Sequence, residues 1–390
     1  MNKHIGKEIP LSETTKFIVD NRGRTVPTVN KGIPLIATDC INNKSLYPLY
    51  LNLRYVSHET YNDWFRSHPK PGDIILTLKG SQNGAVCLVP NPVDFVIAQD
   101  MVALRANEDV IDPLFLFAAL RSSDVQTQIK NLDVSGVIPH LKKSDFDKLL
   151  LPYPERKIQA FIGKVYYELC RKIHLLNSQN KTLESMMDTL FQQWFVKDIN
   201  EGWDEKPLSS IANFLNGLAC QKYPPKNEID RLPVLKIKEL SSGFTDLSDW
   251  ATSDVNSEYI INSGDVIFAW SASLMVKIWN GSKCILNQHL FKVTSEKFPK
   301  WFYFQWCKYH LAEFISISSS HATTMGHIKR SDLDTAKVLI PSEIELTYMS
   351  ELMVPLLEKQ IINNEQISTL EKLRDTLLPK LLNREVSIEI

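Results

Sequence analysis

The most constraining feature of this 390-residue chain is that one pattern occurs in it twice. His140 is followed by Leu-Lys-Lys-Ser-Asp-Phe-Asp and His327 by Ile-Lys-Arg-Ser-Asp-Leu-Asp, an offset of 187 residues (327 − 140 = 187). At the same offset, eight of the fourteen residues from 177 to 190 are identical to those from 364 to 377. This period exceeds the roughly 20 to 50 residues of a solenoid repeat. Each copy is therefore predicted to be a whole domain plus a connector.

Each copy ends in a stretch whose apolar residues recur at steps of three and four, the heptad pattern of a helix that packs on another helix. A helix of about 40 residues spans about 60 Å and is not stable alone in water. The two helices are predicted to pair, antiparallel because a globular domain separates them, with Asn180, Gln360 and Asn363 fixing the register. The alternative is two unrelated surface helices, each packed on its own domain. The predicted seam residues are Ile162, Val165, Leu169, Leu176, Asn180, Leu183, Leu190, Met349, Leu356, Asn363, Ile367, Leu370 and Leu377.

Upstream of each helix the sequence alternates between strand and helix signals. Gly72-Asp73 and Gly264-Asp265 each precede a short apolar run, which predicts a turn that enters a strand. Pro113 and Pro299 are predicted to open amphipathic helices, since proline is well tolerated at the first helical position. The aromatic run 301–306 could stack on bases, but it aligns with the apolar run 114–117 and is predicted to be core.

These patterns predict an α+β chain with two tandem mixed α/β domains, each followed by a long helix, and an antiparallel coiled coil between the helices. The predicted segments are 1–154, 155–198, 199–342 and 343–385.

Composition indicates a soluble globular protein, with 44% hydrophobic and 23% charged residues. No apolar stretch is long enough to span a membrane and the N-terminus lacks the core of a signal peptide, so a cytoplasmic location is expected. The six cysteines form no C-x-x-C pair, which argues against a zinc ribbon or a disulfide framework. They are predicted to be reduced and mostly buried.

Motifs for catalysis are missing from the sequence. There is no phosphate-binding loop, no glycine-rich turn for a dinucleotide or a methyl donor, and no nucleophile elbow. His321 and His327 have no cysteine or carboxylate companions at ligand spacing, so no metal site is expected. His140 and His327 occupy equivalent positions beside basic residues. They are either base or phosphate contacts or structural histidines.

One family combines these parts in this order. Residues 135–141 (Ser-Gly-Val-Ile-Pro-His-Leu) lead to Leu149-Leu-Leu-Pro-Tyr-Pro-Glu155 and a helix, and residues 323–328 (Thr-Thr-Met-Gly-His-Ile) lead to Val338-Leu-Ile-Pro-Ser-Glu343 and a second helix. With Asn287-Gln-His289, this arrangement resembles the DNA specificity subunit of type I restriction-modification systems. The sequence departs from the family pattern at 155–156 and 343–344, where Glu-Gln is often found, and at 99–100, which lacks the Asn.

The resemblance implies a non-catalytic DNA reader in which each domain recognises one half of an asymmetric double-stranded site and the helices set the spacing. Its implied partners are two modification subunits, which use S-adenosylmethionine to methylate adenine N6, and restriction subunits, which use ATP and Mg. No cofactor is expected on this chain.

The net charge of −1 means that any phosphate-binding charge must be local or supplied by partners. Polar loop residues after the first matched strand, namely Lys79, Ser81, Gln82 and Asn83 in the first copy and Ser271 and Ser273 in the second, are candidates for base readout, although they could equally be ordinary solvent-facing turns. Lys142, Lys143, Lys329 and Arg330 are candidates for phosphate contacts, which position the protein without specifying sequence. The candidates are Lys79, Ser81, Gln82, Asn83, His140, Lys142, Lys143, Ser271, Ser273, His327, Lys329 and Arg330.

Two other functions stay open from the sequence. The first is a protein–protein scaffold built on the helical pair, which would bind no duplex DNA even with its partners present. The second is a nuclease or methyltransferase acting alone, which the missing motifs disfavour.

Overall fold

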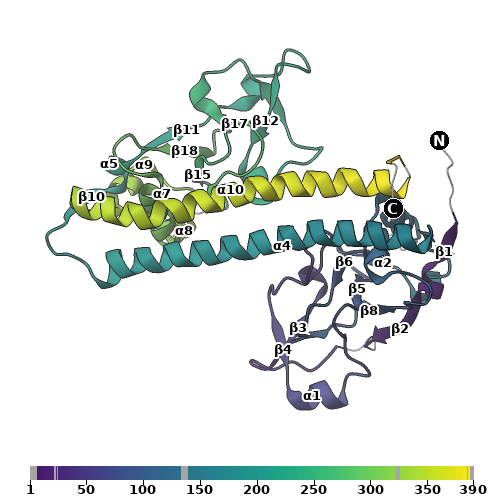
Figure 1. Cartoon of the computed structure of the whole chain (residues 1–390). Helices are drawn as coiled ribbons and strands as arrows, with labels where there is room; N and C mark the ends of the chain where they lie inside the picture. Colours follow the sequence, from purple (N-terminus) through teal and green to yellow (C-terminus); the bar gives the residue numbers. More distant parts are fainter. Residues whose placement is uncertain are drawn as a thin grey trace. The chain divides into compact units, whose positions relative to one another are not determined.

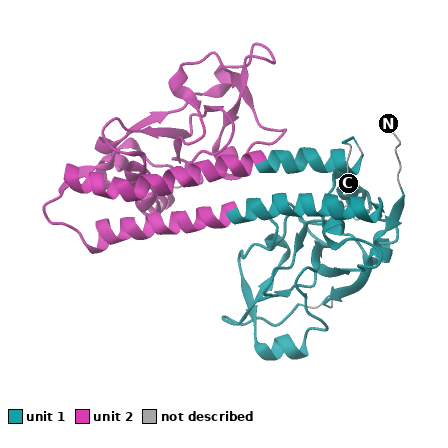
Figure 2. Cartoon of the chain, viewed as in Figure 1, with its two compact units in different colours: residues 1–175, 370–390 teal, residues 176–369 magenta. Residues whose placement is uncertain are grey.

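A computed structural model describes residues 7–21, 23, 25–132, 139–320, 326–383, 385 and 386. His321 and the motif residues 135–138 and 323–325 lie outside these ranges. The chain divides into two compact units (Figure 2): unit 1 comprises residues 1–175 and 370–390, and unit 2 comprises residues 176–369. Each unit holds one globular domain and a stretch of both long helices.

The strands of unit 1 form three small sheets. A four-stranded sheet has the order β2-β8-β5-β6, a three-stranded sheet the order β4-β3-β7 with β3 and β7 parallel, and β1 pairs with β9. These strands are β1 (Glu8–Pro10), β2 (Thr15–Asp20), β3 (Ile33–Ile36), β4 (Arg54–Val56), β5 (Ile74–Thr77), β6 (Val86–Leu88), β7 (Val96–Ile97), β8 (Met101–Ala106) and β9 (Leu150–Pro152).

Unit 2 repeats every strand of this topology and adds one, as expected for a duplicated domain. Its sheets have the orders β11-β18-β15-β16, β13-β12-β17-β14 with β12 and β17 parallel, and β10-β19; β14 is the added strand. These strands are β10 (Asp204–Pro207), β11 (Asn213–Asn216), β12 (Arg231–Leu235), β13 (Trp250–Thr252), β14 (Ile260–Ile261), β15 (Val266–Ala269), β16 (Met275–Ile278), β17 (Cys284–Leu286), β18 (Leu290–Thr294) and β19 (Lys337–Ile340).

Short helices join the strands, and two long helices follow the domains (Figure 1). The short helices are α1 (His58–Asp63), α2 (Pro113–Leu120), α3 (Ser123–Leu132), α5 (Leu208–Ile211), α6 (Ile237–Ser242), α7 (Lys300–Tyr309), α8 (Leu311–Ser320) and α9 (Arg330–Thr335). The long helices are α4 (Arg156–Gln192), which continues into a π-helical turn at Gln193–Lys197, and α10 (Glu343–Leu382). The mixed α/β class and both long helices are as the sequence predicts.

The predicted turns before the central strands are confirmed. Gly72 and Gly264 adopt positive φ angles of 83° and 88°, which favour glycine, and the buried strands β5 and β15 begin two residues later. Both are interior strands, β5 of the sheet β2-β8-β5-β6 and β15 of the equivalent sheet β11-β18-β15-β16.

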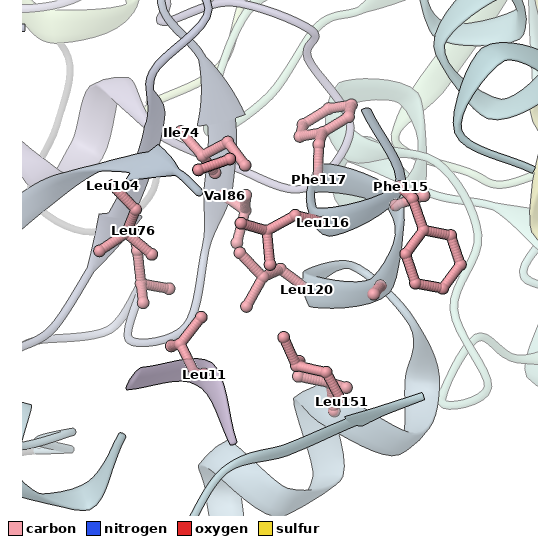
Figure 3. Packing of buried hydrophobic residues seen from close by; sticks show 14 of the residues in the cluster. Leu11, Ile74, Leu76, Val86, Leu104, Phe115, Leu116, Phe117, Leu120 and Leu151 are labelled. Atoms are coloured by element: carbon pink, nitrogen blue, oxygen red, sulfur yellow. The ribbon is translucent and has the colours of Figure 1, made fainter. Parts of the chain in front are cut away.

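Helix α2 is the core helix of unit 1. The Asp112 carboxylate caps it by accepting hydrogen bonds from the Leu114 and Phe115 N–H groups at 3.0 Å each. Residues from Phe115 to Leu120 are all buried, and Figure 3 shows Leu116 and Leu120 directed toward the strand residues Leu76 and Val86. The predicted amphipathic character is therefore wrong, because α2 packs on the sheet with one side and on α4 with another.

Helix α7 holds the same place in unit 2. Residues Trp301 to Cys307 are all buried, which confirms that the aromatic run is core. Here too the amphipathic prediction is wrong. Pro299 is the N-cap residue and the helix begins at Lys300, one residue later than predicted.

The two long helices pack against each other antiparallel within each unit. In unit 1, Leu378 and Leu381 of α10 share a hydrophobic cluster with Ile162 and Tyr166 of α4. In unit 2, later residues of α4 contact earlier residues of α10, and Met187 shares a cluster with Met353. The antiparallel pair predicted from the sequence is present, and each helix also packs on a globular domain.

The structure refines the predicted seam. Its buried members are Ile162, Leu176, Asn180, Leu183, Met349, Asn363 and Ile367, and its half-buried members are Val165, Leu169, Leu190, Leu356, Leu370 and Leu377. Beside most of the half-buried positions, the next residue is buried instead: Tyr166, Cys170, Phe191, Leu357 and Leu378. The frame drifts because a straight helix has 3.6 residues per turn, and because the stripe must also face the domain on which the helix packs.

All six cysteines are free and buried, as predicted. Burial raises the pKa of every one of these thiols, that of Cys87 to about 12. Among the described residues, no helix combines the length and the hydropathy needed to span a membrane.

Candidate nucleic-acid interface

The end of β5 meets the residues around His140 in unit 1. Lys79 and His140 form an isolated antiparallel bridge, flanked by backbone hydrogen bonds from Gly80 N to Pro139 O (3.0 Å) and from Leu141 N to Leu78 O (2.8 Å). Leu78 N also donates to Asp100 O at 2.9 Å. Three segments far apart in sequence are thereby held side by side.

This junction borders an open cleft of about 670 Å³. Its lining residues are Asp20, Gly23, Arg66, Leu78, Lys79, Gln99, Asp100, His140, Leu141, Lys142 and Lys143. Four of the predicted contact residues, Lys79, His140, Lys142 and Lys143, thus come together in one place. Sequence reasoning missed Arg66, Gln99 and Asp100. The matched position of Gln99-Asp100 and Gln288-His289 after equivalent strands was the available signal.

The cleft is locally cationic although the chain is nearly neutral. Arg66, Lys79, Lys142 and Lys143 stand against the carboxylates of Asp20 and Asp100, four cations to two anions. Lys143 forms an ion pair with Asp20, so part of its charge is already balanced. A basic rim with acceptor groups inside it can attract phosphates and still present hydrogen-bonding groups to a base edge.

Ser81, Gln82 and Asn83 form the turn after β5 and do not line the cleft. The Asn83 side-chain carbonyl accepts a hydrogen bond from Leu141 N at 3.3 Å, and Gln82 O accepts one from Ala85 N at 2.9 Å. The turn therefore supports the junction, with Ser81 exposed at its tip.

The equivalent junction of unit 2 has the same backbone geometry. Ser271 and His327 form the isolated bridge, Ala272 N donates to Gly326 O at 2.8 Å, and Ile328 N donates to Trp270 O at 3.0 Å. Ala272 stands where unit 1 has Gly80, and both have positive φ angles, 56° and 94°. Holding an alanine there costs about 1 kcal/mol, which the bridge must offset.

The side chains at this second junction are aromatic and imidazole groups. Trp270 stacks on Phe291 with the ring centroids 5.7 Å apart, and the rings of His289 and His327 lie 6.0 and 6.3 Å from it. The Trp270 indole N–H donates to the Asn216 side chain at 3.2 Å. This surface offers ring faces and imidazole nitrogens where unit 1 offers a charged cleft.

Ser271 and Ser273 differ in exposure. Ser271 is buried and its hydroxyl lies 3.3 Å from His289 Nδ1, while Gln288 Nε2 lies 3.3 Å from His289 Nε2. Ser271 and Gln288 therefore orient the exposed His289 ring, which the sequence did not single out as a contact. Ser273 is exposed in the turn that follows.

Lys142 and Lys329, which follow the two bridging histidines, are the N-cap residues of short helical turns, and an aspartate in each first turn holds the lysine backbone. Asp145 accepts a hydrogen bond from Lys142 N (3.3 Å) and Asp332 accepts one from Lys329 N (2.7 Å), which leaves both lysine residues exposed. A hydrogen bond from Lys148 lowers the pKa of Asp145.

Arg330 has a different role from these two lysines. Its guanidinium donates a hydrogen bond to Phe214 O of strand β11 at 3.0 Å and lies over the Phe291 ring, so it stabilises the position of β11.

Comparison with known proteins now bears on this geometry. The family model of the type I restriction modification DNA specificity domain matches the chain twice, over residues 21–185 and 200–383. The chain belongs to this family. The family match adds to the fold a class of function, selection of a DNA site. Each matched segment covers most of one unit's domain, and the first begins at residue 21, after β1 and β2.

Individual relatives agree with the family model. The chain is similar to the MjaIX specificity subunit of Methanocaldococcus jannaschii, with 26% identity over 83% of this chain and 79% of the relative. It is 20% identical to the HindI specificity subunit of Haemophilus influenzae, over 89% of this chain and 93% of the relative. Its fold is similar to the crystal structure of a type I restriction-modification S subunit from M. genitalium, with a TM-score of 0.59, 14% identity, and coverage of 98% and 97%.

Proposed function

We propose that this chain is the DNA specificity subunit of a type I restriction-modification complex and that each of its two domains reads one half of a bipartite, asymmetric site. The observation that carries the proposal is the pair of equivalent junctions. Both are built on the same backbone bridge, one within each matched family segment, yet they present different side chains. Two domains that share a backbone frame but present different side chains suit two half-sites of different sequence.

In unit 1, the cleft residues divide by chemistry. Arg66 and Lys142, both exposed at the cleft, suit phosphate oxygens and position the domain without specifying sequence. Lys79, Gln99 and Asp100 suit base edges. A carboxylate repels phosphate, so Asp100 is best explained as an acceptor for the amino group of cytosine or adenine in the major groove.

In unit 2, His289, His327 and Gln288 supply the groups for base readout, and Trp270 supplies an apolar ring face suited to a thymine methyl group. Lys329 takes the phosphate role that Lys142 has in unit 1. Arg330 contributes to the stability of the domain and to the local positive field.

The chemistry of modification and cleavage belongs to the partners in this proposal. Two modification subunits bring S-adenosylmethionine and methylate adenine N6, and restriction subunits bring ATP and Mg. This chain binds no cofactor of its own. The partners also contribute basic surface for phosphate contacts, since phosphate neutralisation dominates affinity for DNA.

The paired long helices act as a ruler in this proposal. Because the spacing between half-sites would follow the length of the helices, deletion of seven residues, one heptad, from α4 should change the number of base pairs between the half-sites and leave the bases recognised unchanged. An unchanged number of base pairs between the half-sites would contradict the ruler hypothesis.

The decisive experiment maps N6-methyladenine across the genome of the source strain, with and without this coding sequence. The proposal expects a two-part asymmetric motif that disappears on deletion. Methylation that persists unchanged would contradict it and favour the scaffold function.

Complementation with point variants then assigns the half-sites. Asp100→Asn should alter one half of the motif and leave the other intact, and His289→Ala should do the converse. Ser81→Ala is the matched control for unit 1, because Ser81 lies on the neighbouring turn outside the cleft. A variant that altered both halves would contradict the assignment of one domain to each half.

A further inference from the structure

A buried polar layer crosses the helix pair within unit 2. Asn180 of α4 and Asn363 of α10 are 8% and 0% exposed. Asn363 Nδ2 donates to Asn180 Oδ1 at 2.9 Å and to Gln179 Oε1 at 2.8 Å, and Asn180 Nδ2 donates to Asn364 Oδ1 at 2.8 Å. The neighbouring seam positions are mostly aliphatic.

This layer stabilises the helix pair less than aliphatic residues at the same positions would. Asn363 Oδ1 is buried and accepts no hydrogen bond within the described part of the chain. Buried amides in a helical seam lower stability relative to aliphatic residues, and what they contribute is a preference for one pairing over another. The layer therefore points to a competing pairing that it disfavours.

The duplication identifies that competitor. Shifted by 187 residues, Asn363 corresponds to Leu176 (363 − 187 = 176) and Asn180 to Ile367 (180 + 187 = 367). The antiparallel register that sets 180 opposite 363 also sets 176 opposite 367, because one index falls by four as the other rises by four. Leu176 and Ile367 are 4% and 8% exposed, so they form a buried aliphatic layer. Of two layers related by the duplication, one is amide and one is aliphatic.

The outer acceptors of the amide layer, in contrast, are present in both copies. Asn364 corresponds to Asn177 and Gln179 to Gln366, so these acceptor types occur beside both layers. The difference between the copies is concentrated in the two central residues of each layer, which are the ones that decide what faces what inside the seam.

Self-pairing of either helix would mismatch these layers. Two copies of α4 in the equivalent register would place Asn180 against Leu176, and two copies of α10 would place Asn363 against Ile367. Each such pair contains the mismatch twice and has no amide–amide hydrogen bond. Elsewhere the buried stripes of the two helices are largely alike, with Ile162 and Tyr166 of α4 corresponding to Met349 and Met353 of α10; they differ at Met187, which corresponds to the buried Arg374.

We propose that the Asn180–Asn363 layer makes α4 pair with α10 in preference to the same helix of a second copy of this chain. A duplicated helix pair is otherwise open to exchange between chains, as in domain swapping. The hydrogen bond between the two amides forms only in the mixed pairing, and a lone buried amide against an aliphatic residue is unfavourable. The layer thus selects the partner helix, independently of which DNA is read.

Three full-length variants test this. The mirrored variant, L176N/N180L/N363I/I367N, moves the amide pair to the other layer, where the duplicated acceptors Asn177 and Gln366 adjoin it. The self-pairing variant, N180L/I367N, still has two asparagines in these layers, but both are on α10. Amide then faces amide when α10 pairs with α10, and leucine faces leucine when α4 pairs with α4. The aliphatic variant, N180L/N363I, has no amide pair. Molar mass is measured by light scattering over a range of concentrations, and thermal unfolding by circular dichroism.

The mirrored variant should match the unmodified chain in association and unfold within about 2 °C of it. The self-pairing variant should associate at least about tenfold more strongly and, where dilute, unfold about 3 °C lower or more. If the self-pairing variant does not fold, the aliphatic variant decides, since it should fold and self-associate more than the unmodified chain. Association equal to that of the unmodified chain in the self-pairing or aliphatic variant would overturn the proposal, as would a mirrored variant as disturbed as the self-pairing one.

Discussion

The two units share a strand order but hold their core helices in different ways. In unit 1, Arg121 at the end of α2 is 7% exposed and lies over Phe117, 4.4 Å from the ring centroid, with its guanidinium donating to the backbone carbonyls of Val86, Asn42 and Ser45. In unit 2, the matching residue is Lys308 (121 + 187 = 308), which lies over Phe304 and reaches Glu184 and Asp188 of α4.

The comparison shows which level of structure the duplication preserved. Backbone features recur in both units: the bridge at the end of the central strand, the parallel strand pair and the glycine turn. The side-chain contacts differ: an arginine donates hydrogen bonds to the carbonyls of buried loops in one unit, and a lysine forms partly exposed ion pairs in the other. A fold with the same hydrogen-bonded frame can thus carry two different surfaces.

The largest expected effect comes from the matched cations. Arg121→Met should destabilise unit 1 by about 4 kcal/mol, because buried carbonyls lose their donors. Lys308→Met should cost less than about 1 kcal/mol, since its ion pairs are partly exposed. Urea unfolding of both variants measures the difference. Equal losses in the free energy of unfolding would show that the two cations stabilise their units to the same extent, contrary to this contrast.

A second contrast concerns how the long helices approach the core helices. Gly163 of α4 lies so close to α2 that a Cβ atom would stand 2.4 Å from Phe115 N, whereas the matching residue of α10 is Ser350, whose Oγ accepts a hydrogen bond from the Trp301 indole at 2.9 Å. Gly163→Ser should cost about 3 kcal/mol through overpacking against backbone. Ser350→Gly should cost about 1–2 kcal/mol.

Thermal unfolding of these two variants, with Gly163→Ala as a third, checks the contrast. A Gly163→Ala variant as stable as the unmodified chain would show that α2 and α4 can separate at no cost, contrary to the packing described.

The matched lysines offer a functional comparison. Lys142→Ala and Lys329→Ala should each weaken DNA binding by the assembled complex about fivefold, without changing the motif, and each should reduce the slope of log affinity against log salt by about one. Titration of a labelled duplex at several salt concentrations measures both effects. A changed recognition motif in either variant would move that lysine from phosphate contact to base readout.

The smallest effect concerns the start of α10. Hydrogen bonds from Ser342, and then from the Trp203 indole, lower the pKa of Glu345 to about 2 from an ordinary value near 4.5. A lowered pKa in the folded state means that the contribution to stability is present above about pH 5 and is lost as the pH falls toward 2. Because the carboxylate is partly solvated, the contribution should be below about 1 kcal/mol.

Glu345→Gln should therefore lower the thermal midpoint slightly at pH 7, and the gap from the unmodified chain should narrow steadily below about pH 5 and close near pH 2. Glu343→Gln is the matched control, since its carboxylate lies in the same first turn outside this network. A gap that stays constant between pH 7 and pH 3 would contradict the role given to Glu345. At the positions of Ser342 and Glu345, α4 has Glu155 and Ile158, so unit 1 lacks this capping pair.

Much of this organisation was already determined by the sequence. The offset of 187 residues reports the duplication directly, because two copies of one domain must fold by the same backbone rules. The spacing of apolar residues predicted the two long helices and their pairing, and the globular domain between them predicted that the pair is antiparallel. Glycine-aspartate turns predicted the central strands. The alignment of the aromatic run 301–306 with the apolar run 114–117 indicated a buried core, which the structure confirms for the aromatic run.

Only the tertiary structure decided which side chains meet. The sequence predicted Lys79, His140, Lys142 and Lys143 as candidates, but the meeting of Arg66 and Asp100 with them in one cleft depends on the path of loops whose conformation no local pattern encodes. The same holds for Ser271, which packs behind His289, and for the one-residue drift of the seam toward Tyr166. Periodicity fixes the face of an element, because it follows from backbone geometry. Contacts between distant segments follow from how those faces pack together, and packing is a property of the whole fold.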